Sequence, residues 1–269
     1  MKRIALGLEY DGRSFHGWQR QKGLPSVQMV LEEALFRIAG HSVNVRCAGR
    51  TDAGVHALGQ VVHFDTLANR PETAWVRGVN SFLPASVAVR WSREVSDDFH
   101  ARYAAKSRRY RYLLLNRGER SGLWAGRAGW FHRPLCLEVM QKAAEFLVGE
   151  HNFSAFRAAE CQAKNPVRNL THAEIGQEGD FFFFDFEANA FLQHMVRNMV
   201  GSLVYVGKGA WMPEYLHELL LAGDRTLAAP TFPPDGLYFL GPSYDSALQL
   251  PMAALSDAHT LPGGLSKLR

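Results

Sequence analysis

The alternation of hydrophobic and polar residues divides the first part of the chain into strands and helices. Residues 3–9 alternate as a strand does, and residues 27–38 place apolar side chains at helical spacing. Ser26 can cap the start of this helix, and Gly40 ends it. Strands are predicted next at 43–47 and 59–65, then a short helix at 71–81 and a strand at 87–95. The predicted order is β-α-β-β-α-β.

A second series of the same kind starts at residue 105. A basic segment, residues 105–109, leads into a strand at 110–115. Further strands are predicted near 168–176, 181–187 and 236–241, with helices at 137–148, 191–206 and 213–222. The order is β-α-β-β-α-α-β, which repeats the first series with one extra helix.

Both halves therefore follow the split βαβ plan. The predicted fold class is α/β (α+β), with two ferredoxin-like β-α-β-β-α-β subdomains, mainly antiparallel sheets and a cleft between them, where ligands commonly bind. The predicted domains are residues 1–104, which hold the loop around Asp52, and residues 105–245. Residues 246–269 show little periodicity and are predicted to be a tail.

Composition narrows the class of protein. With 269 residues, 47% hydrophobic and 21% charged, the chain can bury the cores of two ordinary globular domains. No apolar run approaches the roughly 20 residues of a membrane helix, and the first ten residues resemble a strand rather than a signal peptide, so we expect a cytoplasmic protein. The three cysteines form no CxxC pair and the eleven histidines show no metal-binding spacing, so neither a disulfide framework nor a metal site is expected.

The positive charge of the chain comes mainly from arginine. The net charge is +4, and 23 of the 30 Lys and Arg residues are Arg. A guanidinium binds phosphate bidentately and stacks on nucleobases, so this choice fits a nucleic-acid partner. A genome that favours Arg codons explains the same composition, and composition alone leaves both explanations open.

An isolated acid, Asp52, lies in the Gly- and Ala-containing turn of the segment Ala48–Phe64 (AGRTDAGVHALGQVVHF). An Asp in such a turn usually bonds to nearby backbone N–H groups, and this is one interpretation. The neighbouring Arg50 and Thr51 form a charged, hydrogen-bonding cluster just before a strand, where functional loops are common. Asp52 is therefore a candidate catalytic residue.

Two further segments combine cations, amides and aromatic rings as RNA-binding surfaces do. Residues 10–21 (YDGRSFHGWQRQ) contain Arg13 and Gln19, although a hydrophilic loop with one packed Trp would have the same composition. Residues 99–112 alternate cations with aromatic rings, and Tyr110 and Tyr112 should share one face of their strand while Arg109 and Arg111 share the other. We interpret these faces as suited to bases and phosphates, and the alternative is an edge strand with Tyr in the core. The candidate RNA-binding residues are Arg13, Gln19, Phe99, His100, Ala101, Arg102 and Tyr103.

The helix predicted at 191–206 carries an unexpected cation. Its apolar stripe leaves His194, Arg197, Asn198 and Gly201 together on one side. An Arg on so apolar a helix should be at least partly buried and should have an anionic partner. The carboxylate of Asp52 is a candidate for that partner.

These segments together resemble the tRNA pseudouridine synthase A family over nearly the whole chain. The motifs that carry the resemblance are YDGRSFHGWQRQ (10–21), GRTDAGVHALGQVVHF (49–64), FHAR (99–102), SRRYRY (107–112), NAFLQHMVRNMVGSL (189–203) and DGLYF (235–239). The last part of the chain matches no motif.

The resemblance implies the isomerisation of uridine to pseudouridine at positions 38, 39 and 40 of the anticodon stem-loop of tRNA, by a homodimer and without a cofactor. The implied roles are Asp52 as nucleophile, Arg50 as the side chain that enters the RNA and helps to extrude the base, Tyr110 as the ring that packs on the flipped uracil, Arg197 as the partner of the carboxylate, and Leu237 as lining of the base pocket. A single nucleophile fits this reaction, because the same base leaves the sugar and returns to it. One alternative is a non-catalytic protein that binds the anticodon arm; another, an aspartyl-phosphate enzyme, lacks a second acid near Asp52.

Overall fold

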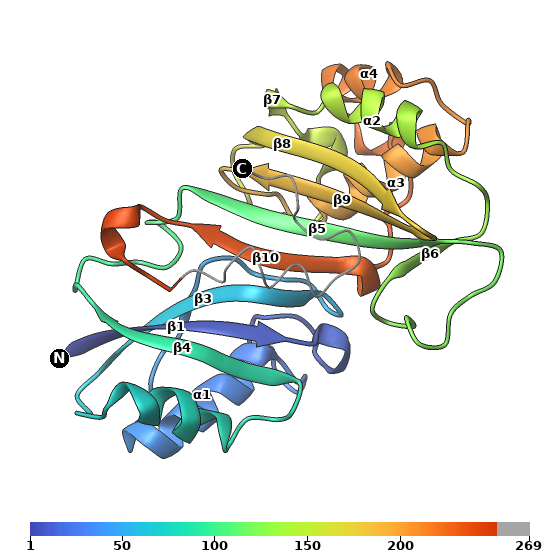
Figure 1. Cartoon of the computed structure of the whole chain (residues 1–269). Coiled ribbons are helices and arrows are strands. Elements are labelled where there is room, and N and C mark those ends of the chain that lie inside the picture. Colours follow the sequence, from blue (N-terminus) through green and yellow to red (C-terminus); the bar gives the residue numbers. More distant parts are fainter. Residues whose placement is uncertain (252–269) are drawn as a thin grey trace. The chain divides into compact units, whose positions relative to one another are not determined.

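The computed structural model describes residues 1–251, and the part of the predicted tail beyond residue 251 lies outside the described residues. The chain forms two compact units (Figure 1). The first contains Met1–Lys106 together with the described residues from Phe239 onward, and the second contains Ser107–Tyr238. The predicted α+β class with mainly antiparallel sheets is confirmed.

The sheet of the first unit is built around its first strand. β1 (Lys2–Tyr10) pairs antiparallel with β3 (His56–Thr66) on one side and with β4 (Val87–Val95) on the other. The short β2 (Arg46–Cys47) extends β3, and β10 (Leu237–Ser243) is also a neighbour of β3. Since the first strand lies between two strands that come later in the chain, this is the split βαβ arrangement that the hydrophobic pattern predicts.

Helix α1 (Val27–Ala39) covers one face of this sheet (Figure 1). The Ser26 hydroxyl accepts the N–H of Met29 and caps the start of the helix, while Gly40 ends it in the left-handed conformation. Both ends are therefore where the sequence predicts them. The segment predicted as a short helix forms a π-helical turn, Ala74–Gly78, whose Trp75 is buried against Phe64.

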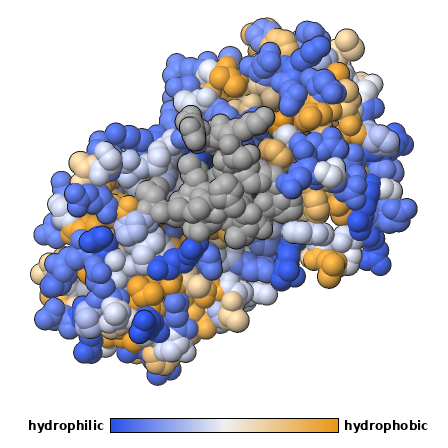
Figure 2. All heavy atoms as spheres, in the orientation of Figure 1, coloured by the Kyte–Doolittle hydropathy of each residue, from blue (hydrophilic) through white to orange (hydrophobic). Residues whose placement is uncertain are grey.

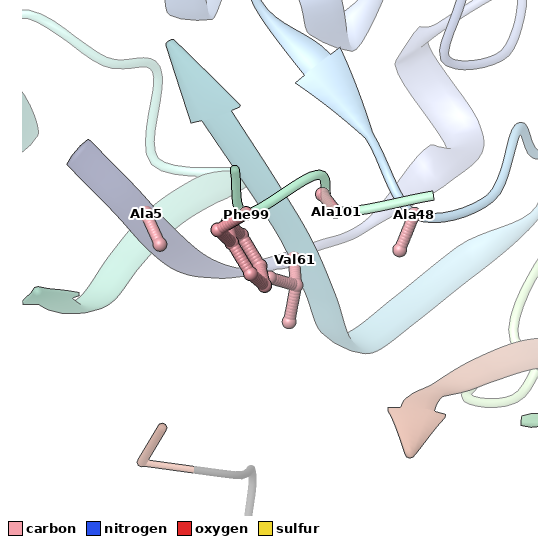
Figure 3. Close-up of a cluster of buried hydrophobic side chains, with 5 residues drawn as sticks. All are labelled: Ala5, Ala48, Val61, Phe99 and Ala101. Carbon is pink, nitrogen blue, oxygen red and sulfur yellow. The ribbon is translucent and has the colours of Figure 1, made fainter. Parts of the chain in front are cut away.

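A separate apolar cluster holds the segment that follows β4. Figure 3 shows its five buried side chains, which are Ala5, Ala48, Val61, Phe99 and Ala101. The ring of Phe99 lies beside Val61 of β3 and packs against Tyr244 at a centroid distance of 5.5 Å. Burial of this one large ring fixes the backbone on which the exposed residues after Phe99 are carried.

The strands of the second unit are also mainly antiparallel. Its strands are β5 (Ser107–Asn116), β9 (Phe181–Ala188), β8 (Val167–Glu178) and β7 (Gly149–Asn152), in that spatial order, and β6 (Gly129–Phe131) pairs parallel with β5. The short β6 and β7 were not predicted, because three or four residues carry no detectable period.

Three helices cover one face of the strands of the second unit (Figure 1). They are α2 (Leu137–Glu145), α3 (Met195–Gly207) and α4 (Tyr215–Ala222). The predicted start of α3 at residue 191 is wrong, since His194 adopts the left-handed conformation (φ 62°) and the helix begins after it. The predicted end of α2 at residue 148 is also too late, because the chain tightens into turns after Glu145.

Hydrophilic residues predominate on the face of each unit that Figure 2 shows, and hydrophobic residues form small separate groups there. Within residues 1–251, no helix is both long and apolar enough to cross a lipid bilayer.

Candidate active site

Asp52 lies in the turn that connects β2 to β3. Its side chain is partly exposed, that of Arg50 is exposed, and that of Thr51 between them is buried. The carbonyl oxygen of Asp52 accepts the N–H of Val55 at 3.2 Å, which closes the turn. Two side chains able to act on a ligand are thus presented on either side of a residue anchored in the core.

The segment after β1 packs directly on this turn. The N–H of Trp18 donates to the carbonyl of Thr51 at 3.0 Å, and the N–H of Gly54 donates to the carbonyl of Phe15 at 3.3 Å. Gly17 has φ of 88°, and a Cβ there would lie 2.6 Å from the Thr51 carbonyl oxygen. Only glycine permits this approach, so the motif at 10–21 supports the motif at 49–64.

Beneath the turn lies a buried polar network. The hydroxyls of Tyr10 and Thr51 share a hydrogen bond of 2.8 Å, and the side-chain amide of Gln60 donates to the carbonyl of Gly49 at 2.7 Å and to the Tyr10 oxygen at 3.5 Å. Burial raises the pKa of the Tyr10 phenol well above its ordinary value, so this group stays protonated at any working pH. The sequence pattern assigns no role to Tyr10 or Gln60. The one signal is the polar Gln60 inside a mainly apolar strand.

Arg13 and Gln19 lie in the supporting segment, and each has a partner within the first unit. The Arg13 guanidinium pairs with the carboxylate of Asp11 at 2.6 Å, and the Gln19 amide donates to the side-chain oxygen of Gln28 at 3.0 Å. Their predicted contacts with RNA stay predictions.

The segment Phe99–Tyr103 combines a buried end with an exposed one. Phe99 and Ala101 are buried, the N–H of Ala101 donates to Nδ1 of His63, and the ring of Tyr103 is 77% exposed. The Tyr103 ring stacks on His100 at a centroid distance of 4.2 Å, and the Arg102 guanidinium lies 5.8 Å from the Tyr103 ring. The exposed end therefore offers a flat aromatic surface next to a cation.

Both histidines of this region are held neutral. Burial is the main cause that lowers the pKa of His63 to about 4, and the neighbouring His100 adds to it. Burial also lowers the pKa of His100, together with the charges of Arg3 and Arg46. The stack of Tyr103 on His100 is consequently a stack of two uncharged rings at neutral pH.

In the second unit, Tyr110 and Tyr112 occupy one face of β5, as predicted. Tyr110 is almost fully buried and meets the ring of Phe191 edge-on at 5.0 Å. Tyr112 is fully buried, and its hydroxyl donates to the carbonyl of Pro233 at 2.9 Å. Tyr112 belongs to the core, so the prediction of an aromatic face for bases is wrong at this position.

The opposite face of β5 carries paired rather than available cations. Arg111 is fully buried and forms a bidentate ion pair with Asp185, its register partner on β9, at 2.7 and 2.6 Å. Arg109 pairs with Glu187 at 3.0 Å. The prediction that Arg111 serves phosphates is wrong, because Asp185 on β9 supplies its counter-charge.

Arg197 lies in the first turn of α3 and is partly buried, as predicted. Its Nε donates to the carbonyl of Phe232 at 2.7 Å, and the N–H of Phe232 donates back to the Arg197 carbonyl at 3.3 Å. The ring of Phe232 meets that of Tyr112 at 5.7 Å. Burial raises the pKa of Tyr112, the charge of Asp235 acts in the same direction, and the charge of Arg197 opposes it.

The predicted polar side of α3 is the surface that holds Arg197 in place. The Asn198 amide accepts from Thr231 at 2.7 Å and from Arg225 at 3.1 Å, and donates to the carbonyl of Phe156 at 2.7 Å. At Gly201 a Cβ would lie 2.4 Å from the carbonyl oxygen of Pro230. The chain before β10 is therefore fastened along one side of the helix.

Leu237 is buried at the start of β10, after the short 3-10 turn Pro234–Gly236. A Cβ on Gly236 would lie 2.2 Å from the carbonyl oxygen of Leu113, so glycine is needed to bring this turn onto β5. Within the second unit, Phe232, to which Arg197 is bonded, and the turn before Leu237 thus both lie against Tyr112, two residues along β5 from Tyr110. The pairing of Arg197 with Asp52 stays a prediction.

No group of three or more His, Cys, Asp or Glu side chains suited to holding a metal ion is present in the described part of the chain.

Comparison with known proteins identifies the family. A family model described as "tRNA pseudouridine synthase" matches residues 8–104 and 143–245. The chain is 63% identical over 249 residues to tRNA pseudouridine synthase A of Dechloromonas aromatica, covering 93% of this chain and 95% of that protein. It is 58% identical to tRNA pseudouridine synthase A of Nitrosomonas eutropha and 56% identical to that of Methylobacillus flagellatus, over 93% of this chain and 90% and 95% of theirs.

Among solved structures, one titled "Crystal Structure of a Cbf5-Nop10-Gar1 Complex" has a TM-score of 0.31 and 11% identity, over 87% of this chain and 57% of that one. A similarity this weak adds nothing to the family match.

The family model and the relatives define the chain as an isomerase that acts on RNA. The chain belongs to the tRNA pseudouridine synthase family. This membership decides against the non-catalytic RNA-binding protein considered above.

Proposed function

We propose that this chain converts uridine to pseudouridine at positions 38, 39 and 40 in the anticodon stem-loop of tRNA, with Asp52 as the nucleophile. One observation carries the assignment to Asp52. Its partly exposed carboxylate is the sole acid between Glu33 and Asp65, and it lies beside the exposed Arg50 on a turn that is fastened to the core.

The reaction needs little more than one such group. The bond between uracil N1 and ribose C1′ breaks, a bond from uracil C5 to C1′ forms, the C5 proton leaves, and N1 gains a proton. No water attacks the sugar, so a second carboxylate set apart for water activation is unnecessary. A nucleophile that splits one difficult step into two easier ones is sufficient, and the proposal requires no metal and no cofactor.

Arg50 is proposed to help extrude the target base. A uracil inside a stem-loop must leave its stack before Asp52 can reach it, which costs on the order of a few kcal/mol. Arg50 is exposed and one residue away from the buried Thr51, so its long side chain can enter the RNA while its backbone stays fixed. Contacts with phosphates and stacking on bases offset the cost of extrusion.

Residues of the second unit are proposed to receive the extruded base. Tyr110 would pack on the uracil and Leu237 would line its pocket, while Arg197 would pair with the Asp52 carboxylate. The hydrogen bond of the Arg197 Nε to the Phe232 carbonyl supports this role, because it uses one donor and leaves the planar fork oriented.

The exposed part of Phe99–Tyr103 is proposed to bind the RNA. Tyr103 offers its ring to a base, Arg102 offers its charge to a phosphate, and His100 supports the ring from below. Arg13 and Gln19 are proposed to contact the same RNA. We further propose that the chain works as a homodimer in the cytoplasm. Sedimentation velocity at several protein concentrations tests whether it is a dimer.

Position mapping tests the proposed substrate. Anticodon-arm transcripts of tRNA are incubated with the chain, and pseudouridine is located by carbodiimide labelling and primer extension. We expect label at 38, 39 and 40 wherever uridine stands there, and none in a matched transcript with cytidine at all three positions. Pseudouridine formed in the cytidine transcript, or only outside the anticodon arm, would show that the assigned positions are wrong.

Removal of its charge tests the proposed role of Arg197. We expect Arg197→Met to lose most of the single-turnover rate and Arg197→Lys to retain more of it, because Lys keeps the charge without the planar fork. Arg168→Met serves as a control and should keep the wild-type rate, since Arg168 is also partly buried but lies on β8 and donates to the carbonyls of Asn165 and Val167. Equal rates for Arg197→Met and wild type would remove Arg197 from the site.

A further inference from the structure

We propose that Tyr10, Thr51 and Gln60 are positioning residues that hold the Asp52 turn in its reactive geometry. The inference rests on the proposed function of Asp52 and goes beyond it, since none of these three side chains touches the substrate. They form the buried network beneath the turn, and all three are buried among the core residues of the first unit.

The side chain of Gln60 continues the hydrogen-bond ladder between β2 and β3 beyond its last backbone bond. The last backbone bond of that ladder joins the N–H of Ala48 to the carbonyl of Val61 at 2.8 Å. At the next residue, Gly49, the side-chain amide of Gln60 takes the place of a backbone peptide group of β3 and provides both a donor and an acceptor. Its N–H donates to the Gly49 carbonyl at 2.7 Å, and its oxygen accepts the Gly49 N–H at 3.5 Å.

A side-chain amide suits this purpose because it carries one donor group and one acceptor, as a peptide does. The chain can therefore leave the sheet at Gly49 without leaving the N–H and C=O of this residue unpaired, which would cost free energy of folding. The second N–H of the same amide reaches the Tyr10 oxygen at 3.5 Å. One residue of β3 thus links the start of the turn to the end of β1.

Thr51 is fastened at two atoms. Its hydroxyl bonds to the Tyr10 hydroxyl at 2.8 Å, and its carbonyl accepts the N–H of Trp18 at 3.0 Å. Since Arg50 and Asp52 flank Thr51, fixing Thr51 sets the direction in which both of their side chains leave the turn. A carboxylate that must approach one sugar or base atom tolerates little displacement, and an error of about 1 Å can cost about 100-fold in rate.

The test removes one hydroxyl at a time. Thr51→Val and Tyr10→Phe each delete one partner of the 2.8 Å bond with little change in shape. We expect each to lower the single-turnover rate of tritium release from [5-³H]uracil-tRNA by about 10- to 100-fold, while the Kd for tRNA changes less than about 3-fold. Thr51→Ser, which keeps the hydroxyl, should restore most of the rate. The double variant should be no slower than the slower single variant, because both act through one bond.

The matched control is Thr66→Val. Thr66 is also a buried threonine of the first unit, and its hydroxyl bonds to His41 Nε2 at 2.9 Å, away from the Asp52 turn. Its loss should lower the melting temperature about as much as Thr51→Val does and leave the rate unchanged. A rate for Thr51→Val and Tyr10→Phe equal to that of Thr66→Val overturns the proposal.

Two further measurements keep the outcomes separate. If Thr51→Val does not fold, Tyr10→Phe and Gln60→Glu are measured instead, because Gln60→Glu keeps the side-chain shape and loses the donor to Gly49. Asp52→Asn is measured in parallel. An inactive Asp52→Asn together with fully active positioning variants overturns the positioning role alone, whereas an active Asp52→Asn overturns the proposed function of Asp52.

Discussion

Arg111 on β5 and Asp185 on β9 form a bidentate ion pair inside the second unit, with N–O distances of 2.7 and 2.6 Å. The two residues are register partners in the antiparallel ladder, and the ring of Phe183 covers the guanidinium at 5.1 Å. A cation from the basic motif that suggested RNA binding is thus part of the core of the sheet.

Removal of one partner of this pair should be severe. Asp185→Asn leaves a buried cation without its counter-charge, which typically costs about 3–5 kcal/mol of the free energy of unfolding. The double variant Arg111→Met with Asp185→Leu removes both charges and should recover much of that loss. Lys2→Met, which breaks the exposed pair of Lys2 with Glu94, should cost less than about 1 kcal/mol. Urea unfolding measures all three, and equal costs for the buried and exposed pairs would contradict this account.

The close approach of Gly17 to the Asp52 turn predicts a second difference. Gly17 and Gly23 both have positive φ, 88° and 74°, so alanine at either site bears the left-handed penalty of about 1 kcal/mol. Only at Gly17 would the new methyl group meet the Thr51 carbonyl, since nothing lies within 4 Å of the Gly23 position. Gly17→Ala should therefore be less stable than Gly23→Ala and should slow tritium release, while Gly23→Ala keeps the wild-type rate. Melting curves and single-turnover rates of the two variants test this predicted difference.

The lowered pKa of His63 predicts how stability depends on pH. Its folded pKa of about 4 lies below the ordinary 6.5, so the folded state binds fewer protons than the unfolded state between these values. The contribution of this group is complete above about pH 6.5 and is lost as pH falls toward 4. His63→Asn, which keeps an acceptor for the Ala101 N–H, should flatten the fall in unfolding free energy over this interval. The exposed His217→Asn should leave it unchanged; identical slopes for His63→Asn and wild type would show that this burial has no such effect.

Salt dependence tests the contacts with phosphate. Log affinity for tRNA should fall linearly with log salt concentration, and loss of one phosphate contact should reduce the slope by about 0.7–0.9. Arg50→Gln and Arg102→Gln should each show this reduction. Arg37→Gln, on the exposed side of α1, should bind with the wild-type slope. Affinity that does not vary with salt would rule out phosphate contacts as the source of binding.

Much of the fold follows from local patterns. α1 with its two caps, β1 and β4 lie where helical spacing and alternation predict them. α1 in particular buries one regular face and ends at Gly40 in the left-handed conformation. The start of α3 is not where it is predicted, since His194 adopts a left-handed conformation that its residue type does not announce. Strand partners are far apart in the chain, so the sequence near Arg111 does not show that Asp185 lies opposite it and allows it to be buried.

The candidate site likewise contains residues that the sequence predicts and residues that it does not. Asp52 and Arg50 could be predicted because they stand out in a short turn and because their motif matches a family. Tyr10 and Gln60 could not, since their role depends on hydrogen bonds across 41 and 11 positions of the chain to Thr51 and Gly49. A polar residue inside an apolar strand signals a buried partner but does not say which one.

The most direct test of the account is the release of tritium from [5-³H]uracil-tRNA by Asp52 variants. Wild type should release label without added metal or nucleotide, because isomerisation expels the C5 proton. Asp52→Asn and Asp52→Ala should release none above background and should still bind tRNA with affinity close to wild type. Substantial turnover by either variant would contradict the assignment of Asp52 as the nucleophile.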